Sequence, residues 1–130
     1  MKKVRVSAAV IHSGTSFLVA RKAKGNNAGY WEFPGGKREY GESGEETLLR
    51  EIHEELGATI EVESLLATIS YSYPEFELTM DCYLAHLTDQ KLTLTEHDEL
   101  RWLSLCELEM MKFLDADLLV IDQIRKHFTG

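Results

Sequence analysis

Short apolar runs separated by turn-forming residues make up most of the chain, and they predict a series of strands. The linker His12-Ser13-Gly14-Thr15 is typical of a hairpin, and Pro34-Gly35-Gly36 predicts a sharp turn after a short strand. Lys24 to Gly29 is a loop by composition. The predicted strands are Val4 to Ile11, Ser16 to Lys22, Trp31 to Phe33, Ile60 to Ser72, Glu77 to Leu87 and Leu100 to Ser104.

A helical spacing replaces this pattern after Ser43. Ser43 and Glu46 have the spacing of a capping box and Gly57 is a natural C-terminal cap, so we expect a helix from about residue 44 to Gly57. A last helix is expected over Ala116 to His127. This order of elements predicts a mixed sheet held between helices, in an α/β or α+β sandwich. The apolar stripe of the first helix is predicted at Leu48, Leu49, Ile52 and Leu56.

Length and composition are those of one domain covering residues 1–130, because 130 residues that are 44% hydrophobic can bury a core without disulfides. Cys82 and Cys106 lack the spacing of a zinc site, and we expect two buried thiols. No apolar stretch approaches the roughly 18 residues that cross a bilayer, and the first residues do not resemble a signal peptide. We therefore expect a cytoplasmic protein without a membrane partner.

The net charge of −8 disfavours a nucleic-acid polymer as partner, because binding its backbone requires clustered Lys and Arg. An anionic small molecule would need local neutralisation, for which a divalent cation is a candidate.

Three acids of the predicted helix have the spacing of such a cation site. Glu51, Glu54 and Glu55 fall on neighbouring positions of one face, where like charges destabilise a helix by about 0.2 to 0.5 kcal/mol per pair. Oxygen ligands in close proximity suit Mg²⁺ or Mn²⁺. An amphipathic helix with a solvated acidic face is the alternative. A glycine turn before the helix, a further acid and an adjacent Arg favour the metal site.

The spacing around these acids resembles the Nudix box, G-x5-E-x7-R-E-U-x-E-E-x-G-U, in which U is a bulky aliphatic residue. Here Gly36 and Glu42 are followed by Arg50-Glu51-Ile52-His53-Glu54-Glu55-Leu56-Gly57, and only Ala58 departs from the pattern. The segment Trp31 to Lys37 resembles the MutT-type branch of that family. The resemblance implies a Nudix α/β/α sandwich and hydrolysis of nucleoside triphosphates to the monophosphate and pyrophosphate.

Carried onto this chain, the resemblance implies that Glu51, Glu54 and Glu55 bind Mg²⁺ or Mn²⁺, with the Gly36 carbonyl as a further ligand. Arg50 would orient the acids, which is compatible with an ordinary ion pair to Glu54. Glu42 is expected to be structural.

The expected reaction is attack of a metal-activated water on a bridging diphosphate. Two candidates for the general base stay open, one of the helix acids and Glu96. His97 is expected to be an exposed loop histidine with no catalytic role.

Similarity to the family also implies contacts to a small nucleotide. Arg21 and Lys37 would contact phosphates, and Phe33 and Tyr73 would lie beside the base.

Asp117 matches the base-reading position of the family, although it could equally be an acid favoured at a helix N-terminus. An ionised Asp only accepts hydrogen bonds, so it would select the cytosine amino group or the guanine N1–H edge. The motif Glu96-His97-x-x-Leu100-x-Trp102 is closer to relatives that act on CTP. We therefore favour a cytosine or modified deoxynucleotide over 8-oxo-dGTP.

Two alternative functions remain. Pro74 occupies a place where ADP-ribose hydrolases often have proline, so ADP-ribose or a dinucleotide could be the substrate. A non-catalytic nucleotide-sensing module on the same fold is disfavoured, because every acid of the box is present. The choice between monomer and homodimer stays open.

Overall fold

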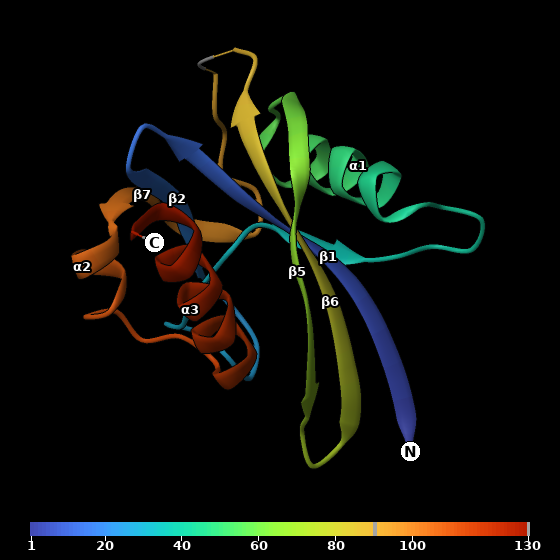
Figure 1. Cartoon of the computed structure of the whole chain (residues 1–130). Coiled ribbons are helices and arrows are strands. Elements are labelled where there is room, and N and C mark those ends of the chain that lie inside the picture. The colour runs from blue at the N-terminus through green and yellow to red at the C-terminus, as the bar shows by residue number, and fades with distance from the viewer. Residues whose placement is uncertain (90, 130) are drawn as a thin grey trace.

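The computed structural model describes residues 1–89 and 91–129. Two long strands over residues 60–72 and 76–87 confirm the predicted pair. The two predicted helices are present over residues 44–56 and 115–129, close to their predicted bounds. A short helix over residues 105–108 was not predicted. Along the chain (Figure 1) the elements are β1 (Lys2–Ser13), β2 (Ser16–Lys22), β3 (Trp31–Glu32), β4 (Gly35–Lys37), α1 (Gly44–Leu56), β5 (Ile60–Ser72), β6 (Phe76–Leu87), β7 (His97–Ser104), α2 (Leu105–Leu108) and α3 (Asp115–Thr129).

The sheet is mixed, as predicted. Strand β1 runs parallel to β6 over ten residue pairs, and β5 and β4 join β6 and β1 as antiparallel neighbours. The expected hairpin of β1 and β2 is limited to two pairs beside the turn, and β2 then pairs with β7 and β3. The predicted hairpin is therefore confirmed at its turn but is short, because β1 is buried on both faces over residues 7–11 and pairs there with β6 and β4.

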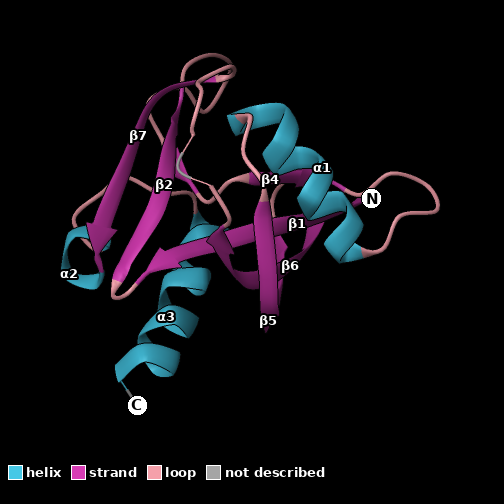
Figure 2. Ribbon diagram, turned by 90° about the horizontal axis from the view of Figure 1, so that it is seen from above, coloured by secondary structure: helices cyan, strands magenta, loops and turns pink. Residues whose placement is uncertain are grey.

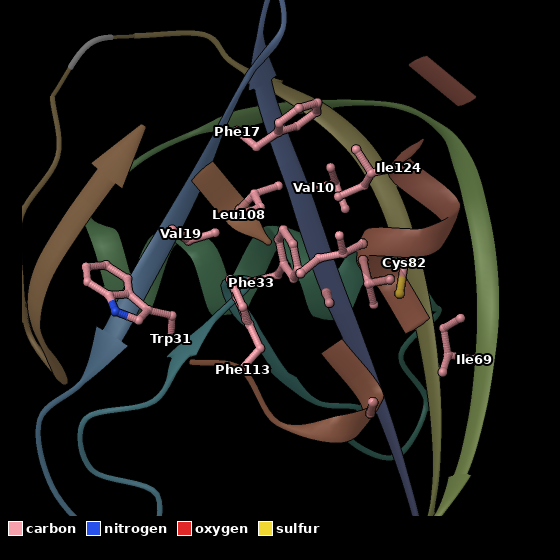
Figure 3. Packing of buried hydrophobic residues seen from close by; sticks show 14 of the residues in the cluster. Val10, Phe17, Val19, Trp31, Phe33, Ile69, Cys82, Leu108, Phe113 and Ile124 are labelled. Atoms are coloured by element: carbon pink, nitrogen blue, oxygen red, sulfur yellow. The ribbon is translucent and has the colours of Figure 1, made fainter. Parts of the chain in front are cut away.

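Helices α1 and α3 lie on opposite sides of this sheet (Figure 2), which confirms the α/β/α sandwich. Alternate residues of β1 serve the two layers, because successive side chains of a strand point to opposite faces. Val10 packs in a core with Phe33 and Ile124, close to α3 (Figure 3). Ile11 packs in the other core, where α1 contributes Ile52. The site described below lies between these two layers.

Helix α1 begins and ends as predicted. Ser43 and Glu46 form the capping box, and Gly57 ends the helix in the left-handed conformation with φ 62°. The predicted apolar stripe needs one correction, because Leu49 is 46% exposed while Glu55 is buried. Leu49 lies about 100° around the helix from Leu48, so the face that meets the sheet is turned toward the acids.

Two local predictions need correction. A bend at Pro34 follows β3 as predicted, but Gly35–Lys37 then forms strand β4, because it pairs with the middle of β1. Cys106 is exposed on the short helix α2, and only Cys82 is a buried thiol. Among residues 1–89 and 91–129, no helix combines the length and apolar character needed to cross a membrane.

Candidate active site

Strand β4 brings the backbone against the acids of α1. Gly36 pairs with Ser7 of β1, and a Cβ atom at Gly36 would lie 2.3 Å from the carboxyl carbon of Glu51. Only glycine allows so close an approach. The polar backbone groups next to Gly36 therefore lie beside the Glu51 carboxylate.

Glu55 points into the protein from the same helix. It is 7% exposed, and its Oε2 atom has no hydrogen-bond partner in the described part of the chain. Burial, followed by the charges of Glu32 and Glu51, raises the pKa of Glu55 to about 8. Because a buried polar atom without a partner is costly, this carboxyl group fits a cation ligand.

Arg50 connects the surrounding acids. Its Nε donates to Glu42 at 2.7 Å, its Nη1 donates to Glu51 at 2.9 Å, and its Nη2 donates to the Lys37 carbonyl at 3.0 Å. A longer contact of 3.4 Å joins Nη1 to Glu54. The Arg50 guanidinium therefore fixes Glu51 relative to β4. The ion pair between Arg50 and Glu54 is present in addition to these bonds.

Glu42 supports Arg50 from the loop before α1. Hydrogen bonds from Arg50, then from the backbone N–H of Glu39 and the hydroxyl of Thr47, lower the pKa of Glu42 to about 2. These contacts are those of the structural residue that the sequence predicted.

The remaining acids differ in exposure. Burial is the main cause that raises the pKa of Glu51, whereas the side chain of Glu54 is 57% exposed. Glu96 is exposed, and its charge contributes to raising the pKa values of Glu51 and Glu55, so it lies near both. No three His, Cys, Asp or Glu side chains in the described ranges form a ready metal cluster. Further ligands would have to come from water or substrate.

A cavity of about 670 Å³ opens beside this cluster and reaches from Gly36 to the start of α3. Phe33 is 5% exposed and stacks on Phe113 with ring centroids 5.6 Å apart. The Tyr73 hydroxyl accepts a hydrogen bond from the backbone N–H of Ala116 at 3.0 Å. Both aromatic residues line the cavity, so the structure brings them together with Gly36.

Asp117 lines the far end of the cavity and is 8% exposed. It also belongs to the first turn of α3, which is the alternative position that the sequence predicted. Burial, followed by the charge of Glu32, raises the pKa of Asp117 to about 8. Burial therefore disfavours the ionised carboxylate that was expected here, and the contact of Asp117 with a base stays a prediction.

Arg21 and Lys37 do not line the cavity. The Nε of Arg21 donates to Asp98 at 2.7 Å, and its guanidinium also approaches Glu99 at 3.6 Å. Lys37 is exposed on β4 and contributes its carbonyl to Arg50. Their expected phosphate contacts stay predictions.

His97 corrects another expectation, because it is buried in β7 and not exposed in a loop. Its Nε2 lies 2.7 Å from the Oε2 atom of Glu32, which lines the cavity. Little in the sequence indicates this pair. Glu32 is only marked as an acid between two aromatic residues, and its partner lies 65 residues away.

Comparison with known proteins decides the family. Residues 1–123 match the family model of the NUDIX domain. The chain belongs to the Nudix family. Its relatives include an 8-oxo-dGTP diphosphatase of Proteus vulgaris, 39% identical over 98 residues that cover 73% of this chain and 85% of the relative. A CTP pyrophosphohydrolase of Escherichia coli is 34% identical over 125 residues, covering 94% of this chain and 91% of the relative.

Solved Nudix structures share the architecture. The solution structure of the E. coli ORF135 protein has a TM-score of 0.83 and 32% identity, and the match covers 97% of this chain and 91% of that chain. These findings confirm the resemblance, the sandwich fold and the assignment as a MutT-like Nudix hydrolase.

Proposed function

We propose that this Nudix hydrolase is a divalent-metal-dependent pyrophosphohydrolase that converts a cytosine nucleoside triphosphate to the monophosphate and pyrophosphate. The observation that carries the proposal is the buried Oε2 atom of Glu55, which has no hydrogen-bond partner among the described residues, on the helix beside a cavity that Gly36 and Asp117 line. The similarity to the E. coli CTP pyrophosphohydrolase supports the same substrate class.

Glu51, Glu55 and the Gly36 carbonyl would hold the cation, with Glu54 at the exposed side. Bound there, Mg²⁺ or Mn²⁺ supplies charge that polarises phosphoryl oxygens and acidifies a water molecule. Arg50 keeps Glu51 in place through its bonds to Glu42 and the Lys37 carbonyl.

Glu96 is the general base that we favour of the two candidates. It is exposed to water and near Glu51 and Glu55, whereas Glu54 is paired with Arg50. A base must be free to accept a proton from the attacking water. Glu96→Gln should therefore lower kcat with little change in KM. Glu54→Gln is measured in the same assay as the comparison from the helix acids.

A neutral Asp117 suits cytosine. The protonated carboxyl group has a hydroxyl donor beside a carbonyl acceptor, which matches the adjacent N3 acceptor and amino donor of cytosine. Guanine offers two adjacent donors at N1 and its 2-amino group, which would match the ionised carboxylate instead. Burial of Asp117 therefore favours cytosine over 8-oxo-dGTP, and Phe33 and Tyr73 would bound the same base.

A nucleotide panel tests the proposal. CTP, dCTP, 5-methyl-dCTP, 8-oxo-dGTP and ADP-ribose are assayed with Mg²⁺ and Mn²⁺, and pyrophosphate is measured. The highest kcat/KM is expected for a cytosine nucleotide. Asp117→Asn should keep this preference because its amide also presents a donor beside an acceptor, and Asp117→Leu should lose it. An unchanged substrate profile in Asp117→Leu would show that Asp117 does not recognise the base. Faster cleavage of ADP-ribose than of any triphosphate would make ADP-ribose the substrate instead. Binding of nucleotide without turnover would indicate a sensing module.

Lys37→Ala and Arg21→Ala test the two predicted phosphate contacts. A rise in KM for the triphosphate is expected for each contact that forms.

A further inference from the structure

Among the described residues, the buried His97 and the half-buried Glu32 form a pair at the cavity that the reaction above does not use. The side chain of His97 is 2% exposed and that of Glu32 is 32% exposed. Their contact is short, with 2.7 Å between Nε2 of His97 and Oε2 of Glu32. His97 therefore lies behind Glu32, and Glu32 faces the cavity.

The hydrogen bonds fix which atom carries the proton. Nδ1 of His97 is buried and has no partner in the part of the chain that the structure describes. A proton on Nδ1 would leave a buried N–H unsatisfied, which costs more than leaving an acceptor free. The favoured form of His97 thus has its proton on Nε2 and donates it to Glu32.

The second oxygen of Glu32 is available for a ligand. Oε1 of Glu32 has no hydrogen-bond partner among the described residues, because the bond to His97 uses Oε2. The charge of Glu32 contributes to the raised pKa values of both Glu55 and Asp117, so its carboxyl group lies within electrostatic range of each. Glu32 also lines the same cavity as Gly36, at the proposed phosphate end, and Asp117, at the proposed base end.

We propose that Glu32 binds a hydroxyl group of the nucleotide sugar and that His97 is its positioning residue. The pentose is the part of a nucleotide between phosphates and base, and a hydroxyl is the neutral donor that a carboxylate can accept beside an anionic substrate. The inference rests on the proposed function, since it assigns a third contact within that site.

Comparing dCTP, whose only sugar hydroxyl is the 3′ group, with its 2′,3′-dideoxy analogue, which has none, tests the contact. The wild type should show a kcat/KM about 10-fold higher for dCTP than for the dideoxy analogue. A hydrogen bond to a charged, partly solvated acceptor changes a binding constant by about this factor. Glu32→Leu should bring this ratio close to one. Any effect of Glu32 on Glu55 acts on both substrates alike and cancels in the ratio.

Variants of His97 test positioning. His97→Leu removes the donor and should reduce the ratio, mainly through KM for dCTP. His97→Gln keeps an N–H donor and should restore the ratio. His86→Leu is the matched control, because His86 forms a similar pair with Glu63, at 2.8 Å, outside the cavity. A purely structural role would lower the melting temperature and both kcat/KM values without changing the ratio.

The outcomes separate this inference from the function on which it rests. If the wild type releases no pyrophosphate from any triphosphate, the proposed function fails. If it cleaves dCTP and the dideoxy analogue equally, or if Glu32→Leu keeps the wild-type ratio, the sugar contact is overturned while the function stands. If Glu32→Leu loses the ratio and His97→Leu keeps it, the positioning role of His97 is overturned.

Discussion

Replacing Glu55 by Gln should stabilise the protein in the absence of metal. The pKa of Glu55 rises from 4.5 to about 8 on folding, mainly through burial. A raised carboxyl pKa destabilises the fold, with no cost below about pH 4.5 and the full cost above about pH 8. At pH 7 this cost is about 3 kcal/mol, because it grows by about 1.4 kcal/mol for each pH unit between those limits.

The amide that the Glu55→Gln substitution introduces must itself be buried. This costs about 1 to 2 kcal/mol and reduces the gain in unfolding free energy by that amount. A net gain of about 1 to 2 kcal/mol corresponds to a melting temperature about 3 to 8 °C higher for a domain of this size.

Thermal melts in a chelating buffer between pH 4 and pH 8 measure the effect. Glu55→Gln should be less stable than wild type by about 1 to 2 kcal/mol at pH 4, where only the cost of burying the amide remains, and the difference should change sign and favour the variant increasingly up to pH 8. Mn²⁺ should raise the melting temperature of the wild type but not that of the variant, and the variant should lose turnover. Glu54→Gln is the control, since that side chain is 57% exposed and should melt like the wild type without metal. A Glu55→Gln variant that melts below the wild type at pH 8 would refute the reasoning.

Three further substitutions test the surroundings of the site. Arg50→Lys should lower kcat/KM about 10-fold or more, because one ammonium group cannot replace the separate bonds to Glu42, Glu51 and the Lys37 carbonyl; wild-type kinetics would contradict this. Gly36→Ala should lower turnover about 100-fold with an unchanged circular dichroism spectrum, because its Cβ would displace the Glu51 carboxyl, and full activity would show that Glu51 is not held there. Asp117→Asn should gain stability over wild type from pH 4 to pH 8, at up to about 1.4 kcal/mol per pH unit in urea titrations, because burial raises the pKa of Asp117 to about 8; a pH-independent difference would refute the raised pKa of Asp117.

The spacing of residues along the chain predicted those elements whose ends are marked by capping or turn-forming residues. Helix α1 was predicted through its capping residues and Gly57, and β5 as a long strand that ends before the turn at Tyr73-Pro74-Glu75. Pairing partners were less predictable, because Gly35–Lys37 forms a strand only through its pairing with β1. The local sequence does not indicate that long-range contact.

The site follows the same division. The helical spacing of Glu51, Glu54 and Glu55 could be predicted, but the burial of Glu55 depends on how far α1 is rotated against the sheet. The raised pKa of Asp117 could not be predicted either, because its main cause is burial in the folded protein. His97 was misassigned for the same reason, since its partner Glu32 comes from another strand.

Binding of Mn²⁺ followed by electron paramagnetic resonance tests the central claim most directly. Titrations of the wild type and Glu55→Gln at pH 8, each with and without a non-hydrolysable cytidine triphosphate analogue, count bound ions and give their affinities. We expect the wild type to bind Mn²⁺ more tightly when the nucleotide is present, and Glu55→Gln to lose a site. Equal Mn²⁺ binding by the two proteins would contradict the assignment of this helix as the metal site.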